Sequence, residues 1–158
     1  MSVRTRSFLW FQNNAEEAAN LYTSLIENSE IRSIERVPVG ESDAPEVIVI
    51  NFTIGGQEFV IMQAPGGPEP KNSFSISILC NDQAEVDRIW DALVEGGEGV
   101  ACGWLRDRYG ISWQVTPKRM NELMEAGNSA HRAAVMQAMM GMVKFDIAGL
   151  ERAFEESK

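Results

Sequence analysis

An internal repeat of apolar helix positions restricts the fold more than any other feature of the sequence. A shift of 68 residues (86 − 18) places five apolar positions of segment 18–26 on five apolar positions of segment 86–94. Their spacing is that of one face of a helix. The pairs are Ala18 with Val86, Leu21 with Ile89, Tyr22 with Trp90, Leu25 with Leu93, and Ile26 with Val94. Because strand-like alternation surrounds both helices, we predict two α+β modules of similar construction.

The second module is shorter than the first. The segment 56–61 matches 110–115 at a shift of only 54 residues (110 − 56), and this places an aromatic residue on an aromatic residue. The missing residues fall between the second helix and a turn at 107–110. That interval has room for one full strand or two very short ones. In the first module, residues 40–45 are predicted to form a loop.

We predict one domain over residues 1–158, with modules at about 4–63 and 73–117. Residues 64–71 hold three prolines and two glycines, a composition typical of a linker and not of a strand. After the second module the pattern becomes helical, so residues 118–158 are predicted to form a helical C-terminal extension.

Local signals mark the start of each repeated helix and one exposed strand. Asn13-Asn14 precedes the first helix and is predicted to cap it. Asp82 and Glu85 have the spacing of a capping box at the start of the second helix. Residues 30–39 alternate but are largely polar, which predicts a strand at a sheet edge.

The C-terminal extension is rich in methionine and presents an apolar stripe. The stripe consists of Ala133, Met136, Met140 and Val143, with Met139 beside it. Such a surface either packs on the sheet of its own chain or forms an adaptable interface, and both interpretations stay open. Together with the exposed edge strand, it leads us to expect a homodimer.

The densest chemistry lies in residues 102–117, where a turn centred on Asp107 and Gly110 leads into a strand. In that strand Trp113 faces one way and Gln114 faces the other, because side chains alternate. A plain hairpin needs only the turn, so the tryptophans, arginines and cysteine of this stretch exceed what local structure requires.

These residues resemble the PhnB-like proteins, a branch of the glyoxalase/bleomycin-resistance/extradiol-dioxygenase (vicinal oxygen chelate) superfamily. Some members carry a demethylubiquinone methyltransferase-type name. The matching motifs are Cys102-Gly103-Trp104-Leu105-x-Asp107-Arg108-x-Gly110-x-Ser112-Trp113-Gln114, Phe8-Leu9-Trp10-Phe11 with Ala15-Glu16-Glu17-Ala18-Ala19 and Tyr22, Cys80-Asn81-Asp82-Gln83-Ala84-Glu85-Val86-Asp87 with Trp90 and Leu93, and Met139-Met140-Gly141-Met142 with Lys144 and Asp146. The resemblance implies an α+β fold of two unequal βαβββ modules, whose mixed sheets curve around a cavity. It also implies pairing of chains.

Charge and apolar run lengths exclude several partners. The chain has 23 acidic and 14 basic side chains and a net charge of −9, which argues against nucleic acid or an anionic membrane surface. No apolar run approaches the roughly 20 residues that span a bilayer, and the apolar run near the N-terminus is too short for a secretory signal, so we expect a cytoplasmic protein. Cys80 and Cys102 read as buried thiols, although a disulfide or redox pair stays open.

Metal-dependent members of the superfamily take ligands from the first and last strands of each module. The resemblance places these positions at 6–8, 60–62, 75–77 and Gln114, where no His, Asp or Glu occurs. A divalent ion ordinarily needs about three imidazole, carboxylate or thiolate donors. The single histidine, His131, lies in the C-terminal extension. We therefore predict no bound metal and no other cofactor.

The predicted ligand-binding residues are those expected to line one cavity. They are Gln114, Trp113, Arg108, Ser75, Ser77 and Trp104. Gln114 is either a polar anchor for a ligand or a hydrogen-bonded sheet residue, and Arg108 either contacts a ligand or belongs to a structural clamp at the turn. The tryptophans line a pocket or pack in the core. We take Gln114 as the cavity residue and Trp113 as its support against a helix.

Two functions of different classes follow. One is a protein that binds a small organic molecule without chemistry. The alternative is a lyase, isomerase or dioxygenase of the superfamily. A lack of His and of buried Asp or Glu on the inner strands favours binding. Methyltransferase activity has no support, because Gly55-Gly56 joins two strands and Gly66-Gly67 lies among prolines, and neither pair opens a nucleotide-binding helix.

Overall fold

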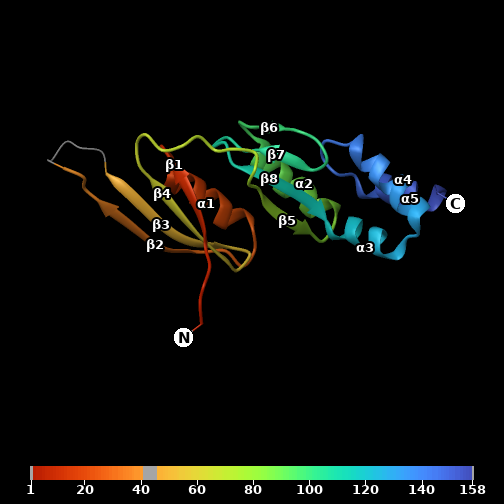
Figure 1. Ribbon diagram of the computed structural model, residues 1–158, viewed down its shortest axis with the longest axis horizontal. Coiled ribbons are helices and arrows are strands. Elements are labelled where there is room, and N and C mark those ends of the chain that lie inside the picture. The colour runs from red at the N-terminus through yellow and green to blue at the C-terminus, as the bar shows by residue number, and fades with distance from the viewer. Residues whose placement is uncertain (1, 41–45, 158) are drawn as a thin grey trace. The chain divides into compact units, whose positions relative to one another are not determined.

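The computed structural model describes residues 2–40 and 46–157, so residues 41–45 of the loop predicted at 40–45 lie outside the described part. The chain forms two compact units, Met1–Pro70 and Lys71–Lys158. Each unit contains a four-stranded mixed sheet and a helix that contacts its strands (Figure 1).

The first unit has the strand order β1-β4-β3-β2, with β1 parallel to β4 and the other neighbours antiparallel. Its elements are β1 Ser7–Phe11, α1 Ala15–Leu25, β2 Ile31–Val37, β3 Val47–Ile54 and β4 Gln57–Gln63. The tight β3–β4 hairpin uses Gly55 and Gly56, both at positive φ, as the glycine pair predicts.

The helix α1 packs an apolar face against this sheet, and of the predicted stripe Ala18, Tyr22 and Leu25 are buried, whereas Leu21 is partly buried. The buried side chains are Ala15, Ala18, Ala19, Tyr22 and Leu25 from α1, and Leu9, Phe11, Ile50, Phe52, Phe59 and Ile61 from the strands. Burial of this apolar surface stabilises the packing of α1 on the sheet.

The start of α1 is capped differently from the prediction. Asn14 occupies the N-cap position, but it has φ 60° and its side chain makes no capping hydrogen bond. Instead the backbone N–H of Ala15 donates to Oε1 of Gln63, 3.0 Å away on β4. Asparagine tolerates this left-handed conformation, so here it turns the backbone and a distant side chain supplies the cap.

The second unit repeats the arrangement with the order β5-β8-β7-β6 and a parallel β5–β8 pair. Its sheet and first helix are β5 Ile76–Cys80, α2 Gln83–Val94, β6 Glu98–Gly99, β7 Trp104–Arg106 and β8 Ser112–Pro117. The interval after α2 thus holds two very short strands, one of the predicted alternatives. Asp82 caps α2 by accepting from the Glu85 N–H at 2.8 Å.

The C-terminal extension forms three helices, α3 Lys118–Ala126, α4 Ser129–Met140 and α5 Ile147–Glu156. They enclose a small core of Leu123, Val135, Phe145 and Leu150. Met136 and Met140 are 40% and 69% exposed, whereas Met139 packs against this core, so the predicted stripe does not pack as a whole on the sheet of its own chain. No helix in the described ranges has the length and apolar character to cross a membrane.

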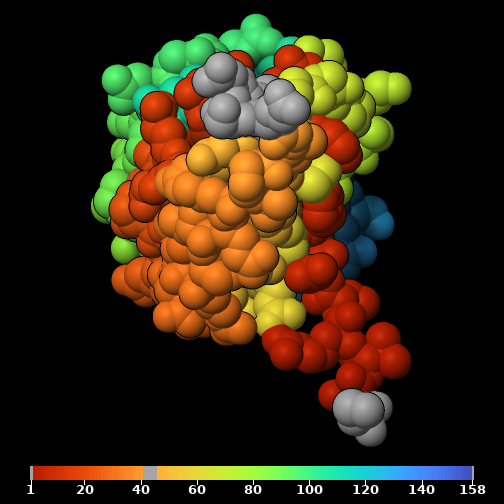
Figure 2. Space-filling view, turned by 90° about the vertical axis from the view of Figure 1, so that its left-hand side faces the viewer, coloured from red at the N-terminus to blue at the C-terminus, as the bar shows by residue number. Residues whose placement is uncertain are grey.

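Strand β2 lies at the edge of the first sheet, as predicted for the polar segment 30–39. Figure 2 shows this strand, in orange, across the front of the unit. Ile34 and Val37 are 38% and 48% exposed on it.

Candidate functional site: the polar face of the second sheet

The second sheet has one apolar and one polar face. Because side chains alternate along a strand, α2 covers the face that carries Ile78, Trp113 and Val115. The opposite face, called the polar face below, carries the alternate positions. These are Ser75 and Ser77 at β5, Trp104 and Arg106 on β7, and Ser112, Gln114 and Thr116 on β8.

Gln114 lies at the centre of the polar face. Its neighbours in register are Ser77 on β5 and Trp104 on β7. Its Nε2 donates to Oγ of Ser75 at 3.0 Å. Gln114 and Trp104 are half-buried, whereas Ser77 is exposed. The structure therefore brings four of the predicted site residues together on one surface.

A second polar cluster adjoins Gln114 on the same face. Arg106 donates through Nη2 to Oδ1 of Asn72 at 2.6 Å, and Ser112 donates to the same oxygen at 3.4 Å. Nη1 of Arg106 also lies 3.4 Å from a carboxylate oxygen of Glu98, at the sheet edge. Arg106 is not among the site residues predicted from the sequence. Its position two residues after Trp104 was the signal that could have found it.

Trp113 lies on the apolar face, completely buried. Its ring Nε1 donates to Oδ2 of Asp107 at 2.8 Å. Asp107 is itself only 3% exposed, and its Oδ1 accepts from the backbone N–H groups of Tyr109 and Ile111 at 2.9 and 3.0 Å. The carboxylate therefore fixes the turn and the start of β8, which sets the register that places Gln114. We call Asp107 and the three N–H groups that donate to it, from Tyr109, Ile111 and Trp113, the Asp107 clamp.

Arg108 lies in the turn and does not join the polar face. Its guanidinium is 3.9 Å from a carboxylate oxygen of Glu95 and 5.8 Å from the ring centroid of Tyr109. The structure thus places the neighbouring Arg106, and not Arg108, beside the centre of the polar face. A ligand contact by Arg108 stays a prediction.

Neither a cluster of metal-binding residues nor a reactive thiol marks this face. Within residues 2–40 and 46–157, no three His, Cys, Asp or Glu side chains are close enough together to hold a metal ion. Burial, reinforced by the negative charge of Glu85, raises the pKa of the Cys80 thiol to about 12. Cys80 is therefore a neutral, buried thiol on the apolar side, whereas Cys102 is partly exposed.

Comparison with known proteins identifies the family. The family model described as 3-demethylubiquinone-9 3-methyltransferase matches residues 4–116. The chain belongs to this family. The PhnB-like chain is 31% identical to the PhnB protein of Bacillus cereus, with a TM-score of 0.66, over 73% of this chain and 99% of that chain. The predicted PhnB-like family and glyoxalase-like α+β fold are confirmed.

Two further solved structures share the fold of the PhnB-like chain. A Pseudomonas aeruginosa protein is 24% identical, with a TM-score of 0.57, and the match covers 73% of this chain and 98% of that chain. The fosfomycin resistance protein FosX of Listeria monocytogenes is 17% identical, with a TM-score of 0.54, over 81% of this chain and 99% of that chain. A search of the curated proteins finds no match.

Proposed function

We propose that this PhnB-like protein binds a small organic molecule on the polar face of its second sheet, without a metal held by the protein. The observation that carries the proposal is the arrangement around Gln114. The amide of Gln114 on β8 lies between two serines on the β5 side and the half-buried Trp104 on β7, on a face that α2 leaves uncovered.

The chemistry of these groups suits recognition. In the described part of the chain, Oε1 of Gln114 has no hydrogen-bond partner, so it can accept from a ligand while Nε2 stays with Ser75. The indole of Trp104 supplies a flat apolar surface, and Ser77 supplies a hydroxyl that can donate or accept. Ligand sites commonly combine an apolar surface with a few fixed polar groups in this way.

A protein-bound metal does not fit the residues of this fold. A FosX structure from Listeria monocytogenes is complexed with Mn(II), and the superfamily draws its ligands from the first and last strands of each module. At these positions the polar face offers Ser75, Ser77 and Gln114, and the face of the first sheet opposite α1 offers Arg6, Phe8, Val60 and Met62. Hydroxyls and one amide are poor donors for a catalytic divalent ion.

The methyltransferase description of the family also lacks a matching site. An S-adenosylmethionine site of the Rossmann type requires parallel strands and a Gly-rich turn that opens a helix. Here each sheet has one parallel pair and otherwise antiparallel neighbours, and Gly55-Gly56 closes a hairpin. We therefore do not assign methyl transfer to this chain.

An enzymatic alternative rests on Glu98. Its carboxylate is the one acidic group that the described structure places in register with the polar face, opposite Arg106. It is paired with that arginine and its side chain is 65% exposed. A carboxylate that acts as a general base is usually shielded from water, so that it accepts a proton readily. Because Glu98 is exposed and paired with an arginine, its surroundings favour binding over acid–base catalysis.

The test is ligand capture from a metabolite extract by the native protein, followed by mass spectrometry of the released small molecules. The matched variants are Gln114→Ala and Thr116→Val, two changes on the same face of one strand. We expect wild-type protein and Thr116→Val to retain the same compound and Gln114→Ala to lose it. Equal retention of the compound by all three proteins would contradict the proposal. So would chemical conversion of the compound by the wild-type protein, if the Glu98→Gln variant no longer carries out that conversion.

We also propose that the protein is a homodimer. Among residues 2–40 and 46–157, no strand pairs with the outer side of β2, and such sheet edges are usually covered. The exposed side chains of Met136 and Met140 give α4 a second surface suited to an interface.

A further inference from the structure

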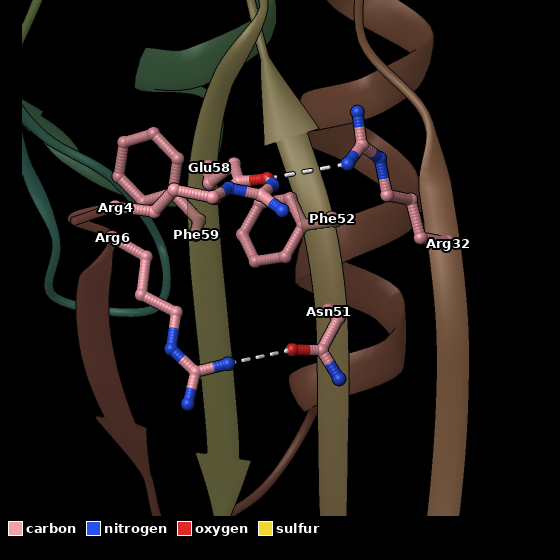
Figure 3. Close-up of a pocket in the computed structure, with 7 residues that line it drawn as sticks. All are labelled: Arg4, Arg6, Arg32, Asn51, Phe52, Glu58 and Phe59. Carbon is pink, nitrogen blue, oxygen red and sulfur yellow. Dashed lines mark hydrogen bonds and ion pairs between the residues drawn. The ribbon is translucent and has the colours of Figure 1, made fainter. Parts of the chain in front are cut away.

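A small pocket in the first unit is lined mainly by charged and polar side chains. It has a volume of about 260 Å³ and lies over β3 and β4, between the segment that precedes β1 and the edge strand β2 (Figure 3). The lining residues are Arg4, Arg6, Arg32, Asn51, Phe52, Glu58 and Phe59. Asn51 and Glu58 point to the side of the sheet opposite α1, since Phe52 and Phe59 alternate with them toward the helix.

The arginines are not all neutralised. Arg4 and Arg32 both pair with the same carboxylate oxygen of Glu58, and Arg32 also lies 3.4 Å from Glu30. The carboxylates of Glu30 and Glu58 thus balance the charges of Arg4 and Arg32. Arg6 has no carboxylate partner in the described ranges, which leaves one excess positive charge here on a chain of net charge −9.

Arg6 is held in place by a neutral group. Its Nη1 donates to Oδ1 of Asn51 at 3.2 Å, and Nδ2 of Asn51 donates to Oγ of Ser33 at 3.0 Å. This chain of hydrogen bonds runs from the N-terminal segment through β3 to β2. It positions the guanidinium, but unlike a carboxylate it does not cancel its charge. The remaining N–H groups of Arg6 can donate to a ligand as a planar fork.

We infer that this pocket binds the oxyanion group, a carboxylate or a phosphate, of a small organic molecule, with Arg6 as the principal contact. Guanidinium groups match both oxyanions because they can donate two parallel hydrogen bonds. Arg4 and Arg32 add positive potential to the pocket. Their shared partner Glu58 is negatively charged and repels a ligand oxyanion, so it restricts where the ligand can bind. The inference concerns the first unit and does not depend on the polar face of the second.

The small volume and the mixed charge limit the ligand. Sites for drug-sized molecules are about 300–1,000 Å³, so a pocket of about 260 Å³ suits a molecule of a few carbons. An anion with more charges than a phosphate or a dicarboxylate is disfavoured because Glu58 and Glu30 lie beside the pocket. Nucleic acid is disfavoured for the same reason and by the net charge of the chain.

The test is isothermal titration of the full-length protein at low ionic strength with inorganic phosphate, with malonate, and with the uncharged analogue malonamide. Arg6→Gln removes the unpaired guanidinium. The matched control is Arg36→Gln, on the same unit, because Arg36 already pairs with Glu16 at 2.5 Å. We expect saturable binding of at least one anion and none of malonamide, with affinity reduced about tenfold or more in Arg6→Gln and changed less than about twofold in Arg36→Gln.

Three outcomes overturn the inference. The first is no saturable binding by the wild-type protein up to about 10 mM of either anion, the weak end of meaningful affinity. The second is equal weakening in both arginine variants, which indicates a general effect of net charge. The third is unchanged affinity in Arg6→Gln. A preference for phosphate or for malonate distinguishes the two anion classes. Arg6→Lys separates charge from geometry, because lysine keeps the charge but loses the fork. Circular dichroism checks that each variant is folded.

Discussion

The Asp107 clamp predicts the largest loss of stability from a single polar substitution in the second unit. Asp107→Ala removes the acceptor of three N–H groups, those of Trp113 Nε1, Ile111 and Tyr109. The first two donors belong to buried residues, and Tyr109 is partly exposed so that water can replace the lost partner. Each buried donor left without an acceptor costs about 1–3 kcal/mol.

Removing the carboxylate also relieves the cost of burying its charge, which lowers the total. We therefore expect Asp107→Ala to reduce the free energy of unfolding by about 2–4 kcal/mol. For a chain of this size, the loss corresponds to a fall in melting temperature of about 4–16 °C.

Urea denaturation followed by far-ultraviolet circular dichroism measures the loss without relying on tryptophan emission. The matched control is Arg108→Gln in the same turn. The guanidinium of Arg108 lies 3.9 Å from the carboxylate of Glu95, whose side chain is 79% exposed. We expect this control to cost about 0–1 kcal/mol. If Asp107→Ala unfolds at the same urea concentration as Arg108→Gln, the clamp does not hold the turn and our account of how Gln114 is placed fails.

Three further predictions follow from the fold and the site. Gln114→Ala is expected to change the free energy of unfolding by less than about 1 kcal/mol and to weaken ligand binding by about 1–3 kcal/mol. Trp113→Ala is expected to lower the free energy of unfolding by about 3–5 kcal/mol. Thermal melts in which Gln114→Ala is the less stable variant would refute this assignment of the two residues to opposite faces of the sheet. Because burial raises the pKa of the Cys80 thiol to about 12, the folded chain keeps a proton that an unfolded thiol loses near 9.0. Stability should therefore fall as pH rises above about 9, less steeply in Cys80→Ala, and equal slopes would contradict this. Sedimentation should give a mass above the 17.6 kDa of one chain, and a concentration-independent mass of one chain would exclude the homodimer.

Features with a local cause could be predicted from the sequence. The two apolar helix stripes, the Gly55-Gly56 hairpin and the Asp82 cap each depend on a few neighbouring residues, and each has the predicted place in the structure. The common strand order of the two sheets also agrees with the repeat found in the sequence.

Features that depend on distant contacts could not be predicted in the same way. The N–H of Ala15 is capped by Gln63 from β4, 48 residues along the chain, so no local pattern shows it. Alternation alone separated Gln114 from Trp113, but it did not show that Asp107 would be buried beneath the turn. Nor did it show that Arg106, and not Arg108, would share a face with Gln114, because that depends on the pairing of β7 with β8.

The central claim, that the protein binds a small organic molecule without a protein-held metal, is tested most directly by native mass spectrometry. The full-length protein is purified under non-denaturing conditions and then treated with excess EDTA. The account predicts a bound organic mass that survives EDTA, is lost on denaturation, and is absent from Gln114→Ala but present in Thr116→Val. A stoichiometric metal mass removed by EDTA together with the organic ligand would contradict it.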